Sequence, residues 1–344
     1  TTEVGPTSSA FSPDGVWLYM TGYTWTIFMQ NGGYWQEWLN CVTRTKIDGS
    51  SKLEVIIGSD KIDDFGKSNS QFSVPTSLQI DSKGNLYVTD YMNDRIQVFT
   101  LEGKYIRSIG VSKPVNLIID EKKNEFYVSS WFIKSNKKED FSVKKPVLNK
   151  YKDLENPVLL QSYDLPFSDY IGAHNIYDSS SGLQYSAVVD IYGSQPKVWI
   201  IGGTPRYIPP SELGNQISTW AKHGIKVYGF DKDKLNLEKD FGKEASNELA
   251  RLTSPLYYRQ KLYVNPKTEF LYLWEGQNED GTGAGKASQE LVEFNPKTGE
   301  SKLVPLPFDA EDIVFDTNGM IYLKSRGVVA RFQMDGMKEI PWDY

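Results

Sequence analysis

Residues 74–110 read VPTSLQIDSKGNLYVTDYMNDRIQVFTLEGKYIRSIG. Four short runs in this stretch, SLQID, NLYVTD, RIQVF and YIRSIG, are rich in β-branched and aromatic residues or alternate apolar with polar ones, as half-buried strands do. The breaks between them, such as Ser82-Lys83-Gly84-Asn85, carry residues that favour turns. The stretch therefore predicts a four-stranded antiparallel meander. Alone it would expose two apolar faces, so we expect copies of it to stack beside it.

Copies of the meander recur along the chain. The guide is the first strand of each copy, in which an apolar-x-apolar run is followed by Asp or Asn and a small turn that ends in Gly. Six copies account for almost all of the 344 residues. The sequence therefore predicts an all-β fold, a single domain over 1–344 that forms a six-bladed β-propeller of four-stranded antiparallel blades. The expected blades are 5–58, 72–110, 114–165, 172–242, 257–307 and 308–342.

Blade four is the copy most stretched by insertions. We expect its first strand in 174–182 and its second in 183–193. Two segments outside the strands, 210–222 and 243–252, have the composition of short helices.

Long insertions separate the second and third strands of several blades. They cover 24–40, 133–145, 194–223 and 277–288. In a propeller these connections emerge on one face, so we expect one elaborated face. Their aromatic residues either pin the loops to the blades or line a groove that stacks on a sugar ring, a peptide or another apolar ligand. The aromatic ligand-binding candidates are Trp25, Trp131 and Trp274.

A second group of candidates lies where strands begin or end near the expected propeller axis. Alignment of the first strands places in one register Ser8, Ser77, Asn116, His174, Lys261 and Asp312. The expected ends of the second strands are Gly22, Asp90, Ser130, Asp190, Glu275 and Ser325. Because strands converge at the axis, these positions are expected to meet at the mouth of a channel.

The chemistry of this set leaves several alternatives open. The catalytic candidates are His174 as a base, assisted by Lys261 and Asp312. The polar ligand-binding candidates are Asn116, Asn175, Arg259, Glu311, Asp90, Asp190 and Glu275. Carboxylates at the channel mouth are also suited to Ca²⁺, which takes about six to eight oxygen ligands. Alternatively, the polar groups satisfy one another and ordered water. No other cofactor is evident.

Composition excludes some classes of protein and site. A net charge of −6 and a pI near 5.2 argue against nucleic-acid binding, which needs a basic face. No apolar run is long enough to span a membrane. The chain has two histidines, His174 and His223, which disfavours a zinc centre built on His and Cys.

The single cysteine, Cys41, is expected to be buried, and Arg95 is expected to tie strands of its blade together.

The guide stretch resembles an NHL repeat of the six-bladed β-propeller kind. The resemblance is carried by Pro75, Asp81, Gly84-Asn85-Leu86-Tyr87-Val88, Asp90, Asn93, Arg95-Ile96-Gln97-Val98-Phe99 and Gly103. It implies the fold but no single activity, because such propellers include scaffolds, sensors, lyases and hydrolases. The metal-dependent amidating lyases of this kind rely on several histidines, which this chain lacks.

Secreted bacterial NHL-like propellers look similar to this chain, so we expect an extracytoplasmic location, periplasmic or secreted. A start at Thr1 would follow from removal of a signal peptide or from trimming of the chain. The leading functional reading is a ligand- or protein-binding module that acts through its aromatic-rich face. The alternative is a lyase or hydrolase acting on a carbohydrate or small organic ester at the channel mouth. A third hypothesis is a subunit of a larger assembly, in which the insertions of this chain grip a neighbouring chain.

Overall fold

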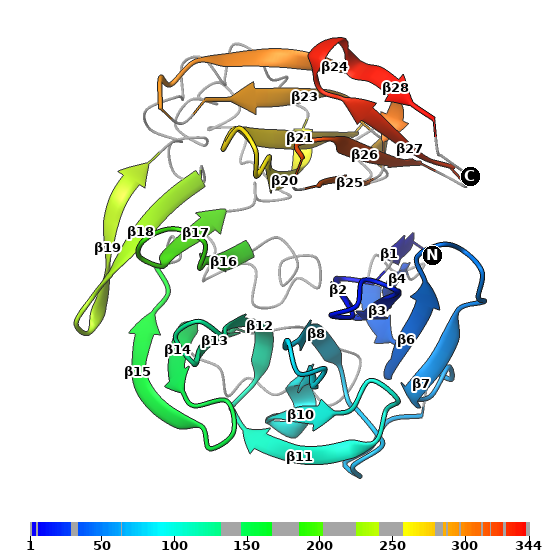
Figure 1. Cartoon of the computed structure of the whole chain (residues 1–344), viewed down its shortest axis with the longest axis vertical. Helices are drawn as coiled ribbons and strands as arrows, with labels where there is room; N and C mark the ends of the chain where they lie inside the picture. The colour runs from blue at the N-terminus through cyan, green and yellow to red at the C-terminus, as the bar shows by residue number, and fades with distance from the viewer. Residues whose placement is uncertain are drawn as a thin grey trace. The chain divides into compact units, whose positions relative to one another are not determined.

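Blade two shows how the sequence pattern becomes a sheet. In the computed structural model it consists of β8 (Pro75–Ile80), β9 (Leu86–Asp90), β10 (Arg95–Phe99) and β11 (Tyr105–Gly110), paired antiparallel in chain order (Figure 1). The first turn is closed by Asp81, whose carboxylate accepts the backbone N–H of Asn85 at 2.7 Å and the hydroxyl of Tyr87 at 3.1 Å. A short side chain that binds its own turn is the local signal that ends the first strand.

The structure describes residues 2–4, 6–28, 34–62, 64–131, 146–166, 186–201, 225–240, 257–278, 285–286, 288–295, 297–310, 312–316, 318–325 and 328–341. The helices expected in 210–222 and 243–252 lie outside these residues.

Six of the seven sheets in the described residues are the blades of a six-bladed β-propeller, as the sequence predicts. Blade one is β2 (Ser8–Phe11), β3 (Trp17–Thr21), β6 (Cys41–Lys46) and β7 (Glu54–Gly58); blade three is β12 (Pro114–Asp120), β13 (Glu125–Ser130), β14 (Val147–Lys152) and β15 (Val158–Asp164). Blade four is β16 (Ser186–Asp190), β17 (Lys197–Ile201), β18 (Ile225–Asp231) and β19 (Lys234–Asp240); blade five is β20 (Tyr257–Val264), β21 (Leu271–Asn278), β23 (Ser288–Phe294) and β24 (Ser301–Ala310), with β22 (Gly285–Lys286) beside β21. Blade six is β25 (Asp312–Phe315), β26 (Ile321–Ser325), β27 (Val328–Gln333) and β28 (Lys338–Ile340).

Blade four corrects the expected strand assignment. The run expected to be its second strand contains β16, which is the first strand of the sheet, and the expected insertion 194–223 contains β17, the second strand. The physical reason is that SAVVD and KVWII are both rich in β-branched residues and are separated by a turn-forming segment. Strand propensity alone therefore fits each run equally well to the first or the second strand of the blade.

The insertion of blade one is also more ordered than a loop. Strands β4 (Thr24–Phe28) and β5 (Tyr34–Trp38) form an antiparallel hairpin, and β1 (Thr2–Val4) pairs with β4 to complete a three-stranded sheet. At the base of the hairpin Thr24 and Trp38 are cross-strand partners and each is 1% exposed. The segment 24–40 therefore forms a small sheet of its own instead of the expected loop.

Apolar side chains fill the space between neighbouring blades. Between blades one and two the cluster comprises Tyr19, Val42, Ile57, Phe72, Leu78, Leu86, Val88 and Phe99. Between blades two and three it comprises Tyr87, Ile96, Val98, Ile109, Val111, Leu117, Ile119, Phe126, Val128 and Tyr151. In the C-terminal part, a separate cluster joins blades five and six, and includes Tyr272, Leu291, Ile313 and Leu323. Blade two thus buries apolar side chains on both of its faces, which the isolated meander could not do.

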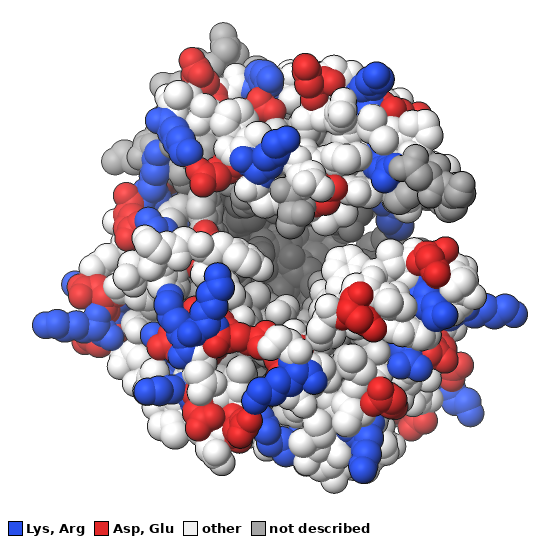
Figure 2. All heavy atoms as spheres, viewed as in Figure 1, with Lys and Arg blue, Asp and Glu red and all other residues white. Residues whose placement is uncertain are grey.

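The surface mixes charges of both signs. On the face viewed in Figure 2, Lys and Arg side chains lie among Asp and Glu side chains across the described residues. The described residues also include no helix that is long and apolar enough to cross a membrane. Neither finding identifies a partner.

The single cysteine is buried, as predicted, and this gives a chemical test of the core. Cys41 is 1% exposed, and burial raises the pKa of its thiol to about 11. Because the thiolate is the reactive form, the native chain is expected to resist iodoacetamide at about pH 8, whereas the urea-unfolded chain is expected to be alkylated. Mass spectrometry measures the adduct. Native and unfolded chains that react at the same rate would contradict this burial.

Candidate functional site

The first strands of blades one to three meet in the register that the sequence predicts. The hydroxyl of Ser8 accepts the backbone N–H of Leu78 at 3.0 Å. One blade further on, the hydroxyl of Ser77 donates to the side-chain oxygen of Asn116 at 3.2 Å and accepts the N–H of Leu117 at 3.3 Å. Three of the six aligned positions, Ser8, Ser77 and Asn116, therefore take part in hydrogen bonds that link the first strand of blade one to that of blade two, and that of blade two to that of blade three.

The residue before each aligned position also forms a hydrogen bond between neighbouring first strands. The hydroxyl of Thr7 donates to the carbonyl of Thr76 at 3.1 Å, and the hydroxyl of Thr76 donates to the carbonyl of Val115 at 2.6 Å. Ser77 and Thr76 are both buried, whereas Asn116 is half-buried. Ser8 is also half-buried, and Thr7 is exposed. Hydroxyl groups engaged in this way hold the strands together.

Asp90, a predicted ligand-binding residue, is the centre of a buried polar network. Its side chain is completely buried, and its carboxylate accepts the N–H of Ser73 at 2.7 Å and the Nε–H of Arg95 at 2.8 Å. It also accepts the side-chain amides of Asn93 at 2.9 Å and Gln97 at 3.3 Å. Burial raises the pKa of the Asp90 carboxyl, while the hydrogen bonds from Ser73, Asn93 and Arg95 act in the opposite direction.

The same network fixes the link between blades one and two. Arg95 donates to the carbonyls of Ser68 at 2.9 Å and Gln71 at 3.3 Å, and Asn93 donates to the carbonyl of Gly66 at 2.7 Å. The expectation that Arg95 ties structure together is confirmed, since it joins β10, β9 and this link. A ligand could reach the Asp90 carboxylate only by displacing donors that hold the link in place.

Two other predicted residues have side chains that the structure describes. Asp190 ends β16, the first strand of blade four, where its carboxylate accepts the N–H of Tyr192 at 2.9 Å. The alignment placed Asp190 at the end of a second strand, and this placement is wrong. Trp131 follows β13 and is 7% exposed, so its ring is packed within the protein.

The remaining predicted residues stay predictions. His174, Asn175 and Glu311 lie outside the described residues. The structure gives a strand backbone but no side-chain placement for Trp25, Arg259, Lys261, Trp274, Glu275 and Asp312. The proposed catalytic set and the Ca²⁺ site rest on these groups. Within the described part of the chain, no three His, Cys, Asp or Glu side chains are grouped to hold a metal.

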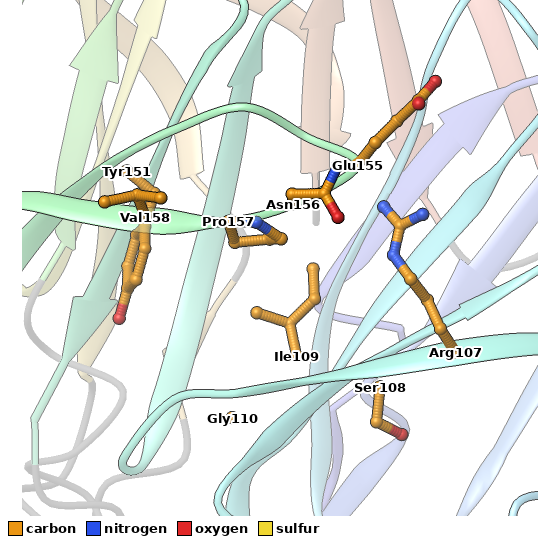
Figure 3. Close-up of a pocket in the computed structure, with 9 residues that line it drawn as sticks. All are labelled: Arg107, Ser108, Ile109, Gly110, Tyr151, Glu155, Asn156, Pro157 and Val158. Atoms are coloured by element: carbon orange, nitrogen blue, oxygen red, sulfur yellow. The ribbon is translucent and has the colours of Figure 1, made fainter.

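A groove at the outer strands was not foreseen from the sequence. It lies between β11 of blade two and the turn that joins β14 to β15 in blade three, and encloses about 500 Å³ (Figure 3). Arg107 stands in it, and its Nη2 donates to the carbonyl of Leu154. The available signal was an arginine inside the otherwise apolar and small run YIRSIG.

Comparison with known proteins does not assign the chain to a family. No family model matches the chain, and no curated protein matches it. Among solved structures, virginiamycin B lyase of Staphylococcus aureus is similar at 12% identity and a TM-score of 0.49, covering 100% of this chain and 88% of that one. A protein from Lactobacillus plantarum is similar at 13% identity and a TM-score of 0.46, and the match covers 92% of this chain and 80% of that one. Hydrazine synthase of Kuenenia stuttgartiensis is similar at 12% identity and a TM-score of 0.45, and the match covers 97% of this chain and 78% of that one. The class that the chain's own strands define is the six-bladed β-propeller.

Proposed function

We propose that the protein is an NHL-type propeller that works outside the cytoplasm as a ligand- or protein-binding module, through the aromatic-rich insertions of its blades. The observation that carries this proposal is the sheet formed by β1, β4 and β5. Its register pairs Ile27 with Trp35 and Phe28 with Tyr34. Trp25 lies in the same hairpin, opposite Glu37. Aromatic residues are thus concentrated on one small ordered element.

The propeller itself does not require this element. Blade two makes the same connection between its second and third strands with the short 3₁₀ helix η1 (Tyr91–Asn93). A long connection that is ordered and aromatic, where a short one suffices, is typical of a recognition element. Aromatic side chains suit that role because they offer large contact area at a low cost in conformational entropy.

The test compares the aromatic hairpin with an exposed aromatic residue elsewhere. The purified chain is applied to an oligosaccharide array and to a phage-displayed linear peptide library. We expect it to bind members of one of them, and the double variant Trp25→Ala/Trp35→Ala to bind them at least about tenfold more weakly. Tyr192→Ala, which removes a ring that is 92% exposed, is the matched control and should bind normally.

Circular dichroism melting of all three proteins reports whether the fold is retained. The proposal fails if neither collection yields a bound member, or if the double variant binds as tightly as the parent chain.

A further inference from the structure

The groove beside β11 has an apolar floor and a polar wall. Its floor includes Ile109 and Tyr151, which are 7% and 8% exposed and belong to the cluster between blades two and three. Figure 3 shows Arg107 extending from β11 towards Asn156, with Ile109 below them and Ser108 directed away. The groove therefore offers a cationic group next to an apolar surface.

The guanidinium of Arg107 is incompletely satisfied within the described residues. Its side chain is half-buried, and its Nε–H is buried without an acceptor among them. No described carboxylate lies close enough to form an ion pair with it. Its Nη2 donates to the neutral carbonyl of Leu154, and the guanidinium also interacts with the hydroxyl of Tyr87 and, at longer range, with the carboxylate of Asp153. Partly buried charges are normally paired, because removal from water otherwise costs free energy.

The two nearest acidic residues of the turn are engaged elsewhere. Glu155 pairs with Lys83 at 3.0 Å, where both side chains are largely exposed. The carboxylate of Asp153 accepts the backbone N–H groups of Glu155 at 2.9 Å and Asn156 at 3.2 Å. The groove thus holds a cation that Asp153 attracts at longer range, but that neither carboxylate of the turn approaches closely enough to form an ion pair.

Both sides of the groove also end in open strand edges. β11 and β15 are each the last strand of their sheet. Along β15, Val158, Leu159 and Leu160 are 59%, 51% and 45% exposed. The only charged side chain of this strand is Asp164 at its end, and the six residues before it, Val158–Tyr163, carry no charge. Charged residues on edge strands normally prevent pairing with other chains, so the part of this edge that lies next to the groove lacks that protection.

We propose that this groove binds an extended peptide segment of another protein in which an Asp or Glu side chain is flanked by apolar residues. The carboxylate meets the guanidinium of Arg107, as charge complementarity requires. The flanking apolar side chains cover Ile109, Tyr151 and Val158, and the peptide backbone adds to an exposed strand edge. A second copy of this chain seated by its own β11 would bring two Arg107 side chains together, so an acidic peptide is the better occupant. This site is separate from the aromatic hairpin.

The probe is a short fluorescein-labelled peptide that alternates valine and threonine and carries one central aspartate. Its counterpart has asparagine in that place. Fluorescence anisotropy with the full chain is expected to show a dissociation constant below about 1 mM for the aspartate peptide, and binding at least about tenfold weaker for the asparagine peptide. Equal affinity for the two peptides, or no binding of either, would overturn the proposal.

Variants of the chain locate the site. Arg107→Gln is expected to weaken binding of the aspartate peptide at least about tenfold, and Lys104→Gln, the same charge change at an exposed residue before β11, should leave it unchanged. Val158→Glu places a negative charge at an exposed position in the groove. This charge repels the aspartate of the peptide, so the variant should bind more weakly without any effect on folding. Unchanged binding by Val158→Glu, or equal losses from Arg107→Gln and Lys104→Gln, would refute the site. Trp25→Ala/Trp35→Ala should bind normally, which separates this test from that of the proposed function.

Discussion

Replacement of Asp90 by alanine is expected to lower the free energy of unfolding by about 3–5 kcal/mol, because it removes one partner of a buried ion pair. The partner, Arg95, is 14% exposed and would keep a charge without its carboxylate. The backbone N–H of Ser73 and the amide of Asn93 would lose the same acceptor. Urea unfolding followed by circular dichroism measures the loss as a shift of the midpoint at constant slope.

The matched control is an ion pair of similar geometry at the surface. Arg44 and Glu54 approach to 2.6 Å, but their side chains are 21% and 47% exposed. Water reaches the Glu54 carboxylate there, and Arg44 keeps its hydrogen bonds to Tyr19 and Leu101, so Glu54→Ala should cost less than about 1 kcal/mol. If Asp90→Ala and Glu54→Ala cost the same, burial is not what makes the Asp90 network important, and its role in holding the link between blades one and two is refuted.

The fold was predictable because its signals are local. Asp81 and Tyr87 lie six residues apart in sequence and close one turn by a hydrogen bond, so the end of one strand and the start of the next can be recognised together. The same arrangement recurs in blade six, where Asp316 accepts the hydroxyl of Tyr322 at 3.2 Å. Blade four was misassigned because β16 and β17 carry no such distinguishing turn, and strand propensity alone does not order two similar runs.

The candidate site was predictable only where it depends on strand register. Alignment of the first strands placed Ser77 and Asn116 together because both occupy the same position in the repeat, and they are hydrogen-bonded. The groove could not be found in this way. Arg107 meets Leu154 across 47 residues of sequence, and no repeat pattern relates an outer strand to the turn of the next blade. Long-range packing, which composition and periodicity do not record, creates that site.

Replacement of Gly58 by alanine is expected to be the other strongly destabilising change, with a loss of about 3 kcal/mol or more. Gly58 has a φ of +81°, where an L-residue costs about 1–2 kcal/mol. An added Cβ would also lie 2.0 Å from the carbonyl oxygen of Asn40 and 2.9 Å from the Cα of Cys41, both backbone atoms. Asn40 has little freedom to move, because its side-chain oxygen accepts the N–H of Val74 at 2.9 Å and so joins blade one to the start of blade two.

Gly49→Ala separates the two causes of this loss. Gly49 has a nearly equal φ of +74°, but an added Cβ there meets nothing within 4 Å. It should therefore lose only the conformational part, about 1–2 kcal/mol, in the same urea measurement. The excess cost of Gly58→Ala over Gly49→Ala then measures how rigidly the backbone at Asn40 is held. Equal losses for the two variants would mean that β7 and Asn40 separate easily, and the close strand contact at Gly58 would not be a determinant of this blade's stability.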